Sequence, residues 1–335
     1  MSSENTEYRG IATNRVLQDD DTFRVEVVKW QKPDGAHKLA VLKSMKDTTN
    51  ERRRDSFQNE NLGTAVFRTL SQDHPEWNLV VPHTYSATPT WSIRRFMKGE
   101  PILREGEEYT NVAQSYNRLA RLATLLANID QVPPDLSSED DPRNSAPYYD
   151  IGARLQTWAH LPVTQGLLSE ESLSRTVDFI HQYQPVIEPR YAHGDLMPYA
   201  HVFDRLDGRL AFIDFEHYSA YKPQYYDAAY CYAQMFVKPN NPHLAGYFLE
   251  KFLENSETPA QQTEKFLSVL AQRSIRLFFD AAYTNMLPHD PVVQRTQALL
   301  DLSLNGNLDS LLHPCYPKSH ATIVSIDENP HIQSA

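Results

Sequence analysis

The sequence has little cysteine and no long apolar run. Only Cys231 and Cys315 occur among 335 residues, and they form no Cys-x-x-Cys pair. Neither a disulfide framework nor a cysteine-rich metal site is therefore expected, and both thiols are predicted to be reduced. No stretch approaches about 18 consecutive apolar residues, so no membrane-spanning helix is predicted. The first ten residues, MSSENTEYRG, are polar and lack the apolar segment of a secretory signal. We expect a cytoplasmic protein.

Positive charge is also in deficit. The chain has 32 Lys and Arg against 43 Asp and Glu, a formal net charge of −11. This balance argues against DNA or RNA as a partner, because binding to a phosphate backbone requires clustered basic residues. The acidic surface has two open explanations, attraction of a cationic small substrate and simple solubility.

Several catalytic motifs are missing as well. The chain contains no GxxxxGK[ST], HExxH or GxSxG, and no metal-type cluster of Cys and His. P-loop nucleotidases, zinc peptidases of the HExxH type and serine hydrolases of the α/β type therefore find no support.

The chain is long enough for two lobes, and the first third is rich in β-strand signals. Residues 23–30 alternate near period two, Pro33-Asp34-Gly35 marks a hairpin, and residues 39–43 form the return strand. Residues 51–71 predict a helix with Leu62, Ala65, Val66 and Leu70 on its apolar stripe. Short strands are expected at residues 78–81 and 90–97.

The rest of the chain reads as mainly helical. Helices are expected near 112–126, 151–160, 170–184, 225–236, 245–252, 264–286 and 291–303, and residues 131–149 form a loop that is either a substrate-side flap or disordered. The break Lys98-Gly99-Glu100-Pro101 looks like the lobe boundary. We predict an α+β, two-lobed protein, divided into a tail (1–10), a β-rich lobe (11–98), a helical lobe (99–312) and a second tail (313–335).

Two acidic motifs lie in the stretch 191–218. HGDL occupies residues 193–196 and IDFE residues 213–216, with an Asp-Gly hairpin turn between two apolar runs. This pattern predicts a loop, a strand, a tight turn and a return strand, which brings Asp195 and Asp214 to the same end of a ribbon. Two carboxylates placed in this way suit phosphoryl transfer, in which one accepts a proton from a hydroxyl and the other holds Mg²⁺.

These two motifs resemble the catalytic loop and the metal loop of the aminoglycoside phosphotransferase and choline kinase superfamily, the small-molecule relatives of the protein kinases. The order of elements is similar over about residues 11–310, but only the two motifs are specific. The resemblance implies a protein-kinase-like fold and an ATP- and Mg²⁺-dependent transfer of phosphate to a hydroxyl of a small molecule. An aminoglycoside-like sugar, a choline-like amino alcohol or a related metabolite would be the acceptor.

The resemblance assigns Asp195 as the catalytic base and Asp214 as the Mg²⁺ ligand. The alternatives are that Asp195 only braces its loop and that Asp214 is a buried, salt-bridged carboxylate. His193 is expected to be structural and to bind the backbone around the loop. Asp227 resembles an acid that braces the catalytic loop, although it could also cap the helix that begins there.

Lys43 resembles the strand lysine that contacts the α- and β-phosphates, and Glu60 is the best candidate for its ion-pair partner. Lys43 could instead be a surface lysine, and Glu51 competes with Glu60, although an acid at a helix start is favoured by the helix dipole in any case. The backbone of Arg95, Phe96 and Met97 is expected to receive the adenine edge through unpaired amides, unless Phe96 is ordinary packing. A further set of aromatic residues is interpreted as core rather than substrate pocket: Tyr221, Tyr225, Tyr226, Tyr230 and Tyr232.

Two features depart from the family pattern. Ala200 stands where the catalytic loop normally has a metal-binding Asn, so His201 is a candidate for a metal-side or phosphate-side role, and Glu216 is its substitute. The turn QDDDT at residues 18–22 lacks glycine and is acidic, which disfavours a triphosphate unless Mg²⁺ offsets the charge. These departures motivate an alternative function, a pseudokinase-like binding or regulatory protein without turnover. The sequence does not determine the acceptor or the oligomeric state.

Overall fold

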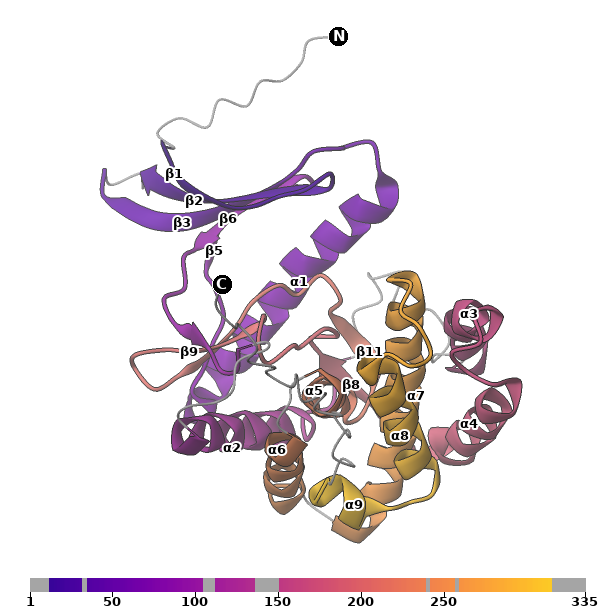
Figure 1. Ribbon diagram of the computed structural model, residues 1–335. Helices are drawn as coiled ribbons and strands as arrows, with labels where there is room; N and C mark the ends of the chain where they lie inside the picture. The colour runs from indigo at the N-terminus through magenta and orange to yellow at the C-terminus, as the bar shows by residue number, and fades with distance from the viewer. Residues whose placement is uncertain are drawn as a thin grey trace, which may run out of the picture.

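The structure, a computed structural model, describes residues 12–31, 35–104, 112–135, 151–238, 242–256 and 259–314. Three predicted features lie largely or wholly outside these residues: the two tails, Cys315 and the loop at 131–149. Only residues 131–135 of the loop and 313–314 of the second tail are described. The described chain forms an antiparallel sheet above a mainly helical half, with a long helix beside both (Figure 1). This confirms the predicted two-lobed α+β fold.

The upper sheet is built from five strands in the order β1-β2-β3-β6-β5. The predicted hairpin is confirmed, because β2 (Phe23–Gln31) and β3 (His37–Met45) pair antiparallel with Val28 opposite Ala40. β6 (Trp91–Arg95) continues the sheet beside β3. The outer strands are β1 (Ala12–Asp19) and β5 (Thr84–Ala87).

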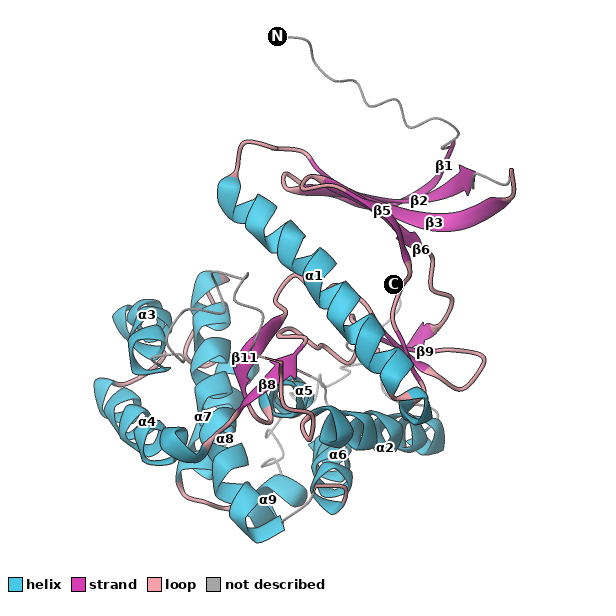
Figure 2. Ribbon diagram, turned by 180° about the vertical axis from the view of Figure 1, so that it is seen from behind, coloured by secondary structure: helices cyan, strands magenta, loops and turns pink. Residues whose placement is uncertain are grey.

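Helix α1 (Glu51–Asp73) crosses from the sheet to the helical half (Figure 2). It begins where the side chain of Asn50 accepts a hydrogen bond from the Arg53 amide, a typical N-cap. The predicted apolar stripe is wrong at Leu62, which is 37% exposed, and at Ala65, which is also exposed. The buried side instead carries Phe57, Asn59, Glu60, Gly63, Thr64, Phe67 and Leu70. A helix that docks partly through polar groups does not show a clean apolar period.

A small second sheet joins the two halves. Its order is β4-β10-β9-β7, and β10 (Leu210–Phe212) pairs antiparallel with β9 (Val202–Asp204) and parallel with β4 (Leu79–Val80). The β9–β10 pair is the hairpin expected between the two acidic motifs. β7 (Glu100–Pro101) pairs with β9, so the chain leaves the upper sheet between β6 and β7. That passage coincides with the predicted break at 98–101.

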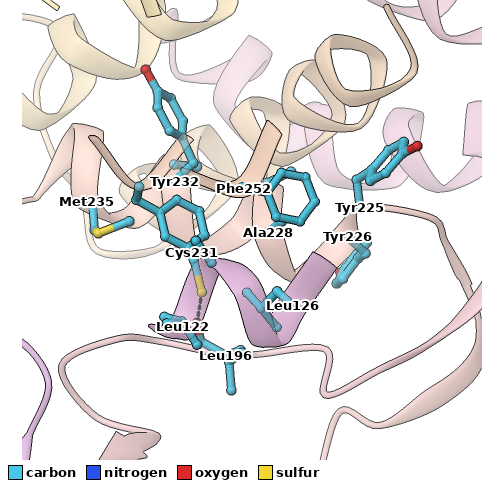
Figure 3. Packing of buried hydrophobic residues seen from close by; sticks show 14 of the residues in the cluster. Leu122, Leu126, Leu196, Tyr225, Tyr226, Ala228, Cys231, Tyr232, Met235 and Phe252 are labelled. Atoms are coloured by element: carbon cyan, nitrogen blue, oxygen red, sulfur yellow. Dashed lines mark hydrogen bonds between the residues drawn. The ribbon is translucent and has the colours of Figure 1, made fainter. Parts of the chain in front are cut away.

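The helical half surrounds α5 (Tyr226–Val237), all of whose residues are buried. Figure 3 shows its packing against Leu122, Leu126 and Phe252. Cys231 lies in this core and its Sγ donates to the Leu196 carbonyl at 2.9 Å. The other helices are α2 (Val112–Ile129), α3 (Ile151–Thr164), α4 (Glu170–Tyr183), α6 (Pro242–Glu254), α7 (Pro259–Tyr283), α8 (Pro291–Leu304) and α9 (Leu308–Leu312).

The sequence did not predict β1, β5 or β7. It also did not predict β8 (Pro189–Ala192) and β11 (Ser219–Pro223). β8 and β11 pair antiparallel and enclose the two acidic motifs between them along the chain. Among the helices described, none combines the length and the apolar character needed to cross a lipid bilayer.

Candidate active site

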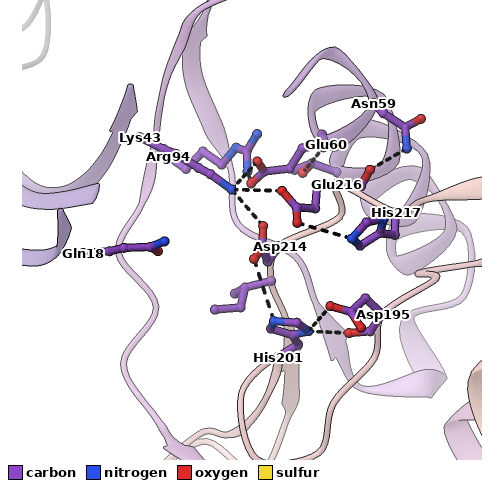
Figure 4. A network of polar contacts seen from close by, with 12 residues as sticks. Gln18, Lys43, Asn59, Glu60, Arg94, Asp195, His201, Asp214, Glu216 and His217 are labelled. Atoms are coloured by element: carbon purple, nitrogen blue, oxygen red, sulfur yellow. Dashed lines mark hydrogen bonds and ion pairs between the residues drawn. The ribbon is translucent and has the colours of Figure 1, made fainter. Parts of the chain in front are cut away.

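Asp195 and Asp214 converge on one imidazole, that of His201 (Figure 4). The Nδ1 atom of His201 lies 3.9 Å from Oδ2 of Asp195, and its Nε2 atom lies 3.7 Å from Oδ2 of Asp214. The β9–β10 register explains the approach, because Val202 lies opposite Phe212 and the Ile213 amide donates to the His201 carbonyl at 3.1 Å. His201 therefore faces Ile213 at the end of the hairpin, and Asp214 is the next residue.

The hydrogen bonds of His201 define its tautomer. Its Nδ1 atom contacts the backbone carbonyl of Asp195, and a carbonyl can only accept, so Nδ1 carries the proton. The lone pair of Nε2 is then free on the side of Asp214. A separation of 3.7 Å is too long for a hydrogen bond and suits two ligands of one cation. The described residues contain no group of three His, Cys, Asp or Glu placed to hold a metal by themselves.

Asp214 follows β10 in a left-handed conformation, with φ of 67°. Non-glycine residues rarely adopt this conformation, and when they do it often marks a functional site. The turn brings Oδ1 of Asp214 to 2.9 Å from Nζ of Lys43. The metal loop of the helical half therefore contacts a side chain of the upper sheet.

Lys43 projects from β3 into a cage of carboxylates. Its Nζ lies 2.8 Å from Glu60, 2.9 Å from Asp214 and 3.9 Å from Glu216. Burial by itself lowers the pKa of Lys43, but the three carboxylates outweigh it and the net pKa is raised. Because only 13% of the side chain is exposed, Lys43 is a charged interior lysine rather than a surface one.

Glu60 is the partner of Lys43, and Glu51 is not. Glu51 has 86% of its side chain exposed and pairs with Arg54. Glu60 has 3% exposed and lies between Lys43 and the guanidinium of Arg94, which it also contacts. Arg94, on β6, donates in addition to the side chain of Asn61 at 2.6 Å. Arg94 could not be recognised from the sequence, since one arginine in a strand is an ordinary surface residue.

The metal loop is attached to α1 by Asn59, a second residue that the sequence did not reveal. The Asn59 side-chain amide donates to the carbonyls of Glu216 at 2.9 Å and Tyr218 at 2.8 Å. One turn later, Gly63 allows close contact, because a Cβ there would lie 2.5 Å from Cβ of Tyr218. The helix that carries Glu60 therefore also holds the loop that carries Asp214.

Asp227 of α5 binds the backbone of the HGD loop. Its carboxylate accepts from the amides of His193 at 2.6 Å and Gly194 at 2.9 Å. Burial raises the pKa of Asp227 to about 6, and these two hydrogen bonds limit the rise. Asp227 does not cap α5, since the N-cap position is Tyr225. Gly194 has φ of 88° and no room for a Cβ, which would lie 1.9 Å from the His217 carbonyl.

His193 joins the two loops. It is fully buried and its Nε2 donates to the Ile213 carbonyl at 2.7 Å. Burial, with a smaller contribution from His201, lowers the pKa of His193 to about 3, so the ring is neutral near pH 7. These contacts match the bracing position expected for it.

Asp195 has an unexpected partner in Tyr230 of α5, whose hydroxyl donates to Oδ1 of Asp195. The sequence predicts that the tyrosine set is core, and Tyr232 agrees, since it is fully buried and its hydroxyl donates to the Leu311 carbonyl at 2.8 Å. Tyr230 lies three residues after Asp227 and therefore on the same side of the helix. The spacing of three residues between Asp227 and Tyr230 was the sequence feature that could have indicated a role for Tyr230 at the site.

The expected adenine contact needs a correction. The amides of Arg95 and Phe96 are not unpaired, because they donate to the carbonyls of His83 at 2.8 Å and Leu39 at 3.3 Å. Of the three residues proposed, Met97 is the one whose amide has no backbone partner within the described part of the chain.

The acidic turn at residues 18–22 is held by its own side chains. Oδ1 of Asp20 accepts from the amides of Thr22 at 2.7 Å and Phe23 at 2.8 Å, and these bonds help lower the pKa of Asp20 to about 2. Asp19 pairs with Lys46 at 2.5 Å and Arg24 at 3.5 Å. The Asp20 side chain thus stabilises the turn in the absence of glycine, and nearby cations offset part of the negative charge.

Glu216 already has two side-chain partners. It lies 3.9 Å from Lys43 Nζ and 3.3 Å from Nε2 of His217. The contact with His217 lowers the pKa of Glu216 most, against the opposing effect of burial. His201 lies within 3.9 Å of a carboxylate of each acidic motif, whereas the contacts of Glu216 are with Lys43 and His217.

The fold and the site together are those of a protein-kinase-like small-molecule kinase. They combine a sheet lobe, a helical lobe with two acidic loops, and a long helix whose acid pairs with a strand lysine. The sequence profile described as "Phosphotransferase enzyme family" matches residues 44–262. The chain belongs to this family, as the two acidic motifs had indicated, and is an enzyme that phosphorylates hydroxyl groups of small molecules. A search of curated protein sequences found no match.

Solved structures share the fold at low sequence identity. The streptomycin–ATP complex of aminoglycoside phosphotransferase APH(2")-IIa is 14% identical with a TM-score of 0.56, over 93% of this chain and 99% of that chain. Ethanolamine kinase from Plasmodium vivax is 13% identical with a TM-score of 0.53, over 90% and 83%. Macrolide 2'-phosphotransferase MphH from Brachybacterium faecium is 14% identical with a TM-score of 0.51, over 92% and 96%.

Proposed function

We propose that this protein transfers the γ-phosphoryl group of ATP, with Mg²⁺, to a hydroxyl of a small molecule. The observation that carries the proposal is the convergence of Asp195, Asp214 and Lys43 around one space, with Lys43 only 2.9 Å from Asp214. Phosphoryl transfer depends mainly on positioning and on neutralising charge, and this arrangement supplies both. The ATP-bound aminoglycoside phosphotransferase complex with a similar fold supports the choice of nucleotide.

In this proposal Asp195 orients the acceptor hydroxyl and takes its proton. Lys43, held by Glu60, contacts the α- and β-phosphates, and Met97 offers its amide to the adenine edge. Asp227 and His193 support the two loops without taking part in proton transfer, since His193 is buried and neutral. Arg95 and Phe96 offer no free amide, because both amides donate to backbone carbonyls.

The residues at the metal position fit a divalent cation. Asp214 supplies a hard carboxylate oxygen, and His201 supplies a nitrogen whose lone pair is set by the bond from Nδ1 to the Asp195 carbonyl. Mg²⁺ would neutralise negative charge on the phosphates. His201 thus occupies the role that Ala200 cannot fill, and Glu216 is left to pair with Lys43 and His217.

Helix α7 carries Asp280, a carboxylate that interacts electrostatically with Asp195. Burial raises the pKa of Asp280. Arg276 and Arg273 lower this pKa, and the negative charge of Asp195 raises it further. Asp280 already pairs with Arg276 at 3.1 Å. The acceptor screen should therefore include amino sugars, amino alcohols such as choline and ethanolamine, and uncharged polyols. These classes include the kinds of acceptor named for proteins of similar fold.

The test is an acceptor screen with ADP detection, followed by Asp195→Asn. Loss of the base carboxylate should lower turnover by roughly 100-fold or more while Mg²⁺–ATP affinity stays near that of the wild type. Asp207→Asn, at the exposed turn of the β9–β10 hairpin, is the matched control. Turnover by Asp195→Asn equal to that of the wild type would refute the assignment.

Thermal melting separates this proposal from a binding protein without turnover. A kinase should be stabilised by ATP more strongly with Mg²⁺ than without it. No effect of millimolar nucleotide would favour the alternative.

A further inference from the structure

The two oxygens of the Asp195 carboxylate have different surroundings. Oδ1 accepts the hydroxyl hydrogen of Tyr230, whereas Oδ2 lies 3.9 Å from Nδ1 of His201. A carboxylate in water exchanges its two oxygens freely by rotation about the Cβ–Cγ bond. A donor fixed to one oxygen removes that freedom and leaves the other oxygen as the available acceptor.

Tyr230 is itself held firmly. It is 4% exposed and lies on α5, three residues after Asp227. The Asp227 carboxylate accepts hydrogen bonds from the amides of His193 and Gly194. One side of α5 therefore binds both the backbone of the HGD loop and the carboxylate of Asp195. The loop and its functional group are thus fixed to the same rigid helix.

A buried arginine supports the tyrosine ring. The guanidinium of Arg273 on α7 lies 4.2 Å from the ring centre of Tyr230 and 4.7 Å from that of Tyr226. It also donates to the hydroxyl of Tyr226 and is 4% exposed. A cation packed against two rings restricts their movement. Burial raises the pKa of Tyr230 far above its usual value, so the hydroxyl keeps its proton and remains a donor.

We propose that Tyr230 is a positioning residue for the catalytic base, supported by Arg273, and that it assigns Oδ2 of Asp195 as the proton-accepting oxygen. The inference rests on the proposed function. In the step, the acceptor O–H proton passes to Oδ2 as the acceptor oxygen bonds to the γ-phosphorus. The bond from that phosphorus to the β–γ bridging oxygen breaks, and its electron pair leaves with ADP.

Tyr230→Phe tests the role, with Tyr232→Phe as the matched control. Both changes remove one buried hydroxyl from the same helix, but the hydroxyl of Tyr232 faces Leu311 rather than the site. With Mg²⁺–ATP and the acceptor found by the screen, Tyr230→Phe should lower kcat by roughly 10- to 100-fold. The KM for ATP and the melting temperature should match those of the control.

The hydrogen bond is tested separately from activity. In protein labelled with [¹³Cζ]tyrosine, the resonance lost in Tyr230→Phe belongs to Tyr230, and it should shift in Asp195→Asn. Tyr230→Phe with wild-type kcat, or an unmoved Tyr230 resonance in Asp195→Asn, overturns the inference. A wild-type protein that releases no ADP with any acceptor overturns the proposed function and the catalytic role of Tyr230 with it. Active wild-type protein with an impaired Tyr230→Phe variant supports both.

Discussion

The Nε2 atom of His201 lies 3.7 Å from Oδ2 of Asp214, while the Nδ1 atom of His201 is bound to the backbone carbonyl of Asp195. A histidine metal ligand normally has its second nitrogen fixed by a carbonyl or carboxylate in this way. The geometry therefore supports the proposed metal-side role of His201.

His201→Ala should weaken Mg²⁺–ADP binding by roughly tenfold or more, since it removes one ligand of the cation. His201→Asn should retain part of the affinity, because its amide oxygen can coordinate. Titration calorimetry with Mg²⁺–ADP measures the change, and the same titration in EDTA should show no difference between variants. Equal Mg²⁺–ADP affinity for His201→Ala and wild type would rule out the ligand role.

Glu60→Gln should destabilise the protein by about 3 kcal/mol, because it leaves Lys43 and Arg94 buried without their shared carboxylate. The urea midpoint of unfolding measures the loss. Arg94→Met should cost less, since the pair between Lys43 and Glu60 remains. The double variant Glu60→Met with Arg94→Met should recover part of the stability, and a strictly additive loss would contradict this account.

Asn59→Ala should weaken the attachment of the metal loop to α1, because the carbonyls of Glu216 and Tyr218 lose their shared donor. The expected cost is about 1–3 kcal/mol of unfolding free energy, with weaker Mg²⁺–nucleotide binding. Asn61→Ala is the control on the same helix, since Asn61 contacts Arg94 and not the loop. Denaturant titration and calorimetry should separate the two variants, and equal nucleotide affinities would show that the loop does not need Asn59.

Asp130 should make stability depend on pH. It is buried at the end of α2, accepts from the Tyr225 amide at 3.1 Å, and burial raises its pKa to about 8. The carboxyl of Asp130 binds its proton more tightly in the folded protein than in the unfolded chain. Its favourable contribution to the free energy of unfolding is therefore fully present below pH 4 and is lost as pH rises toward 8. Between pH 5 and 7.5 the loss should be about 1 kcal/mol per pH unit. Asp130→Asn should reduce this slope in melting curves, and an unchanged slope would contradict the protonated state.

The hairpin signals predicted the geometry of the site well because they are local. An Asp-Gly turn fixes which residues of two short strands face each other, and therefore how near Asp195 and Asp214 can come. Lys43 followed from the alternation of its strand together with the family resemblance. β8 and β11 were not predicted, because no turn signal joins them and their pairing is decided by a partner about 30 residues away along the chain.

The residues missed share one property. Arg94, Asn59 and Tyr230 act through contacts with residues far away in the sequence, and each is ordinary in its local context. The predicted stripe of α1 was wrong at Leu62 and Ala65 for the same reason. That helix buries Glu60 and Asn59 because the metal loop and Lys43 offer them partners, which no helical period can show.

The sequence by itself determined the lobes, the hairpin and the pair of acidic loops, because backbone propensity and turn chemistry act over a few residues. Only the tertiary structure decided which groups surround the two carboxylates. Burial makes each polar contact strong and each unpaired group costly, so the partners that hold Asp195 and Asp214 depend on how the helices and the sheet pack together.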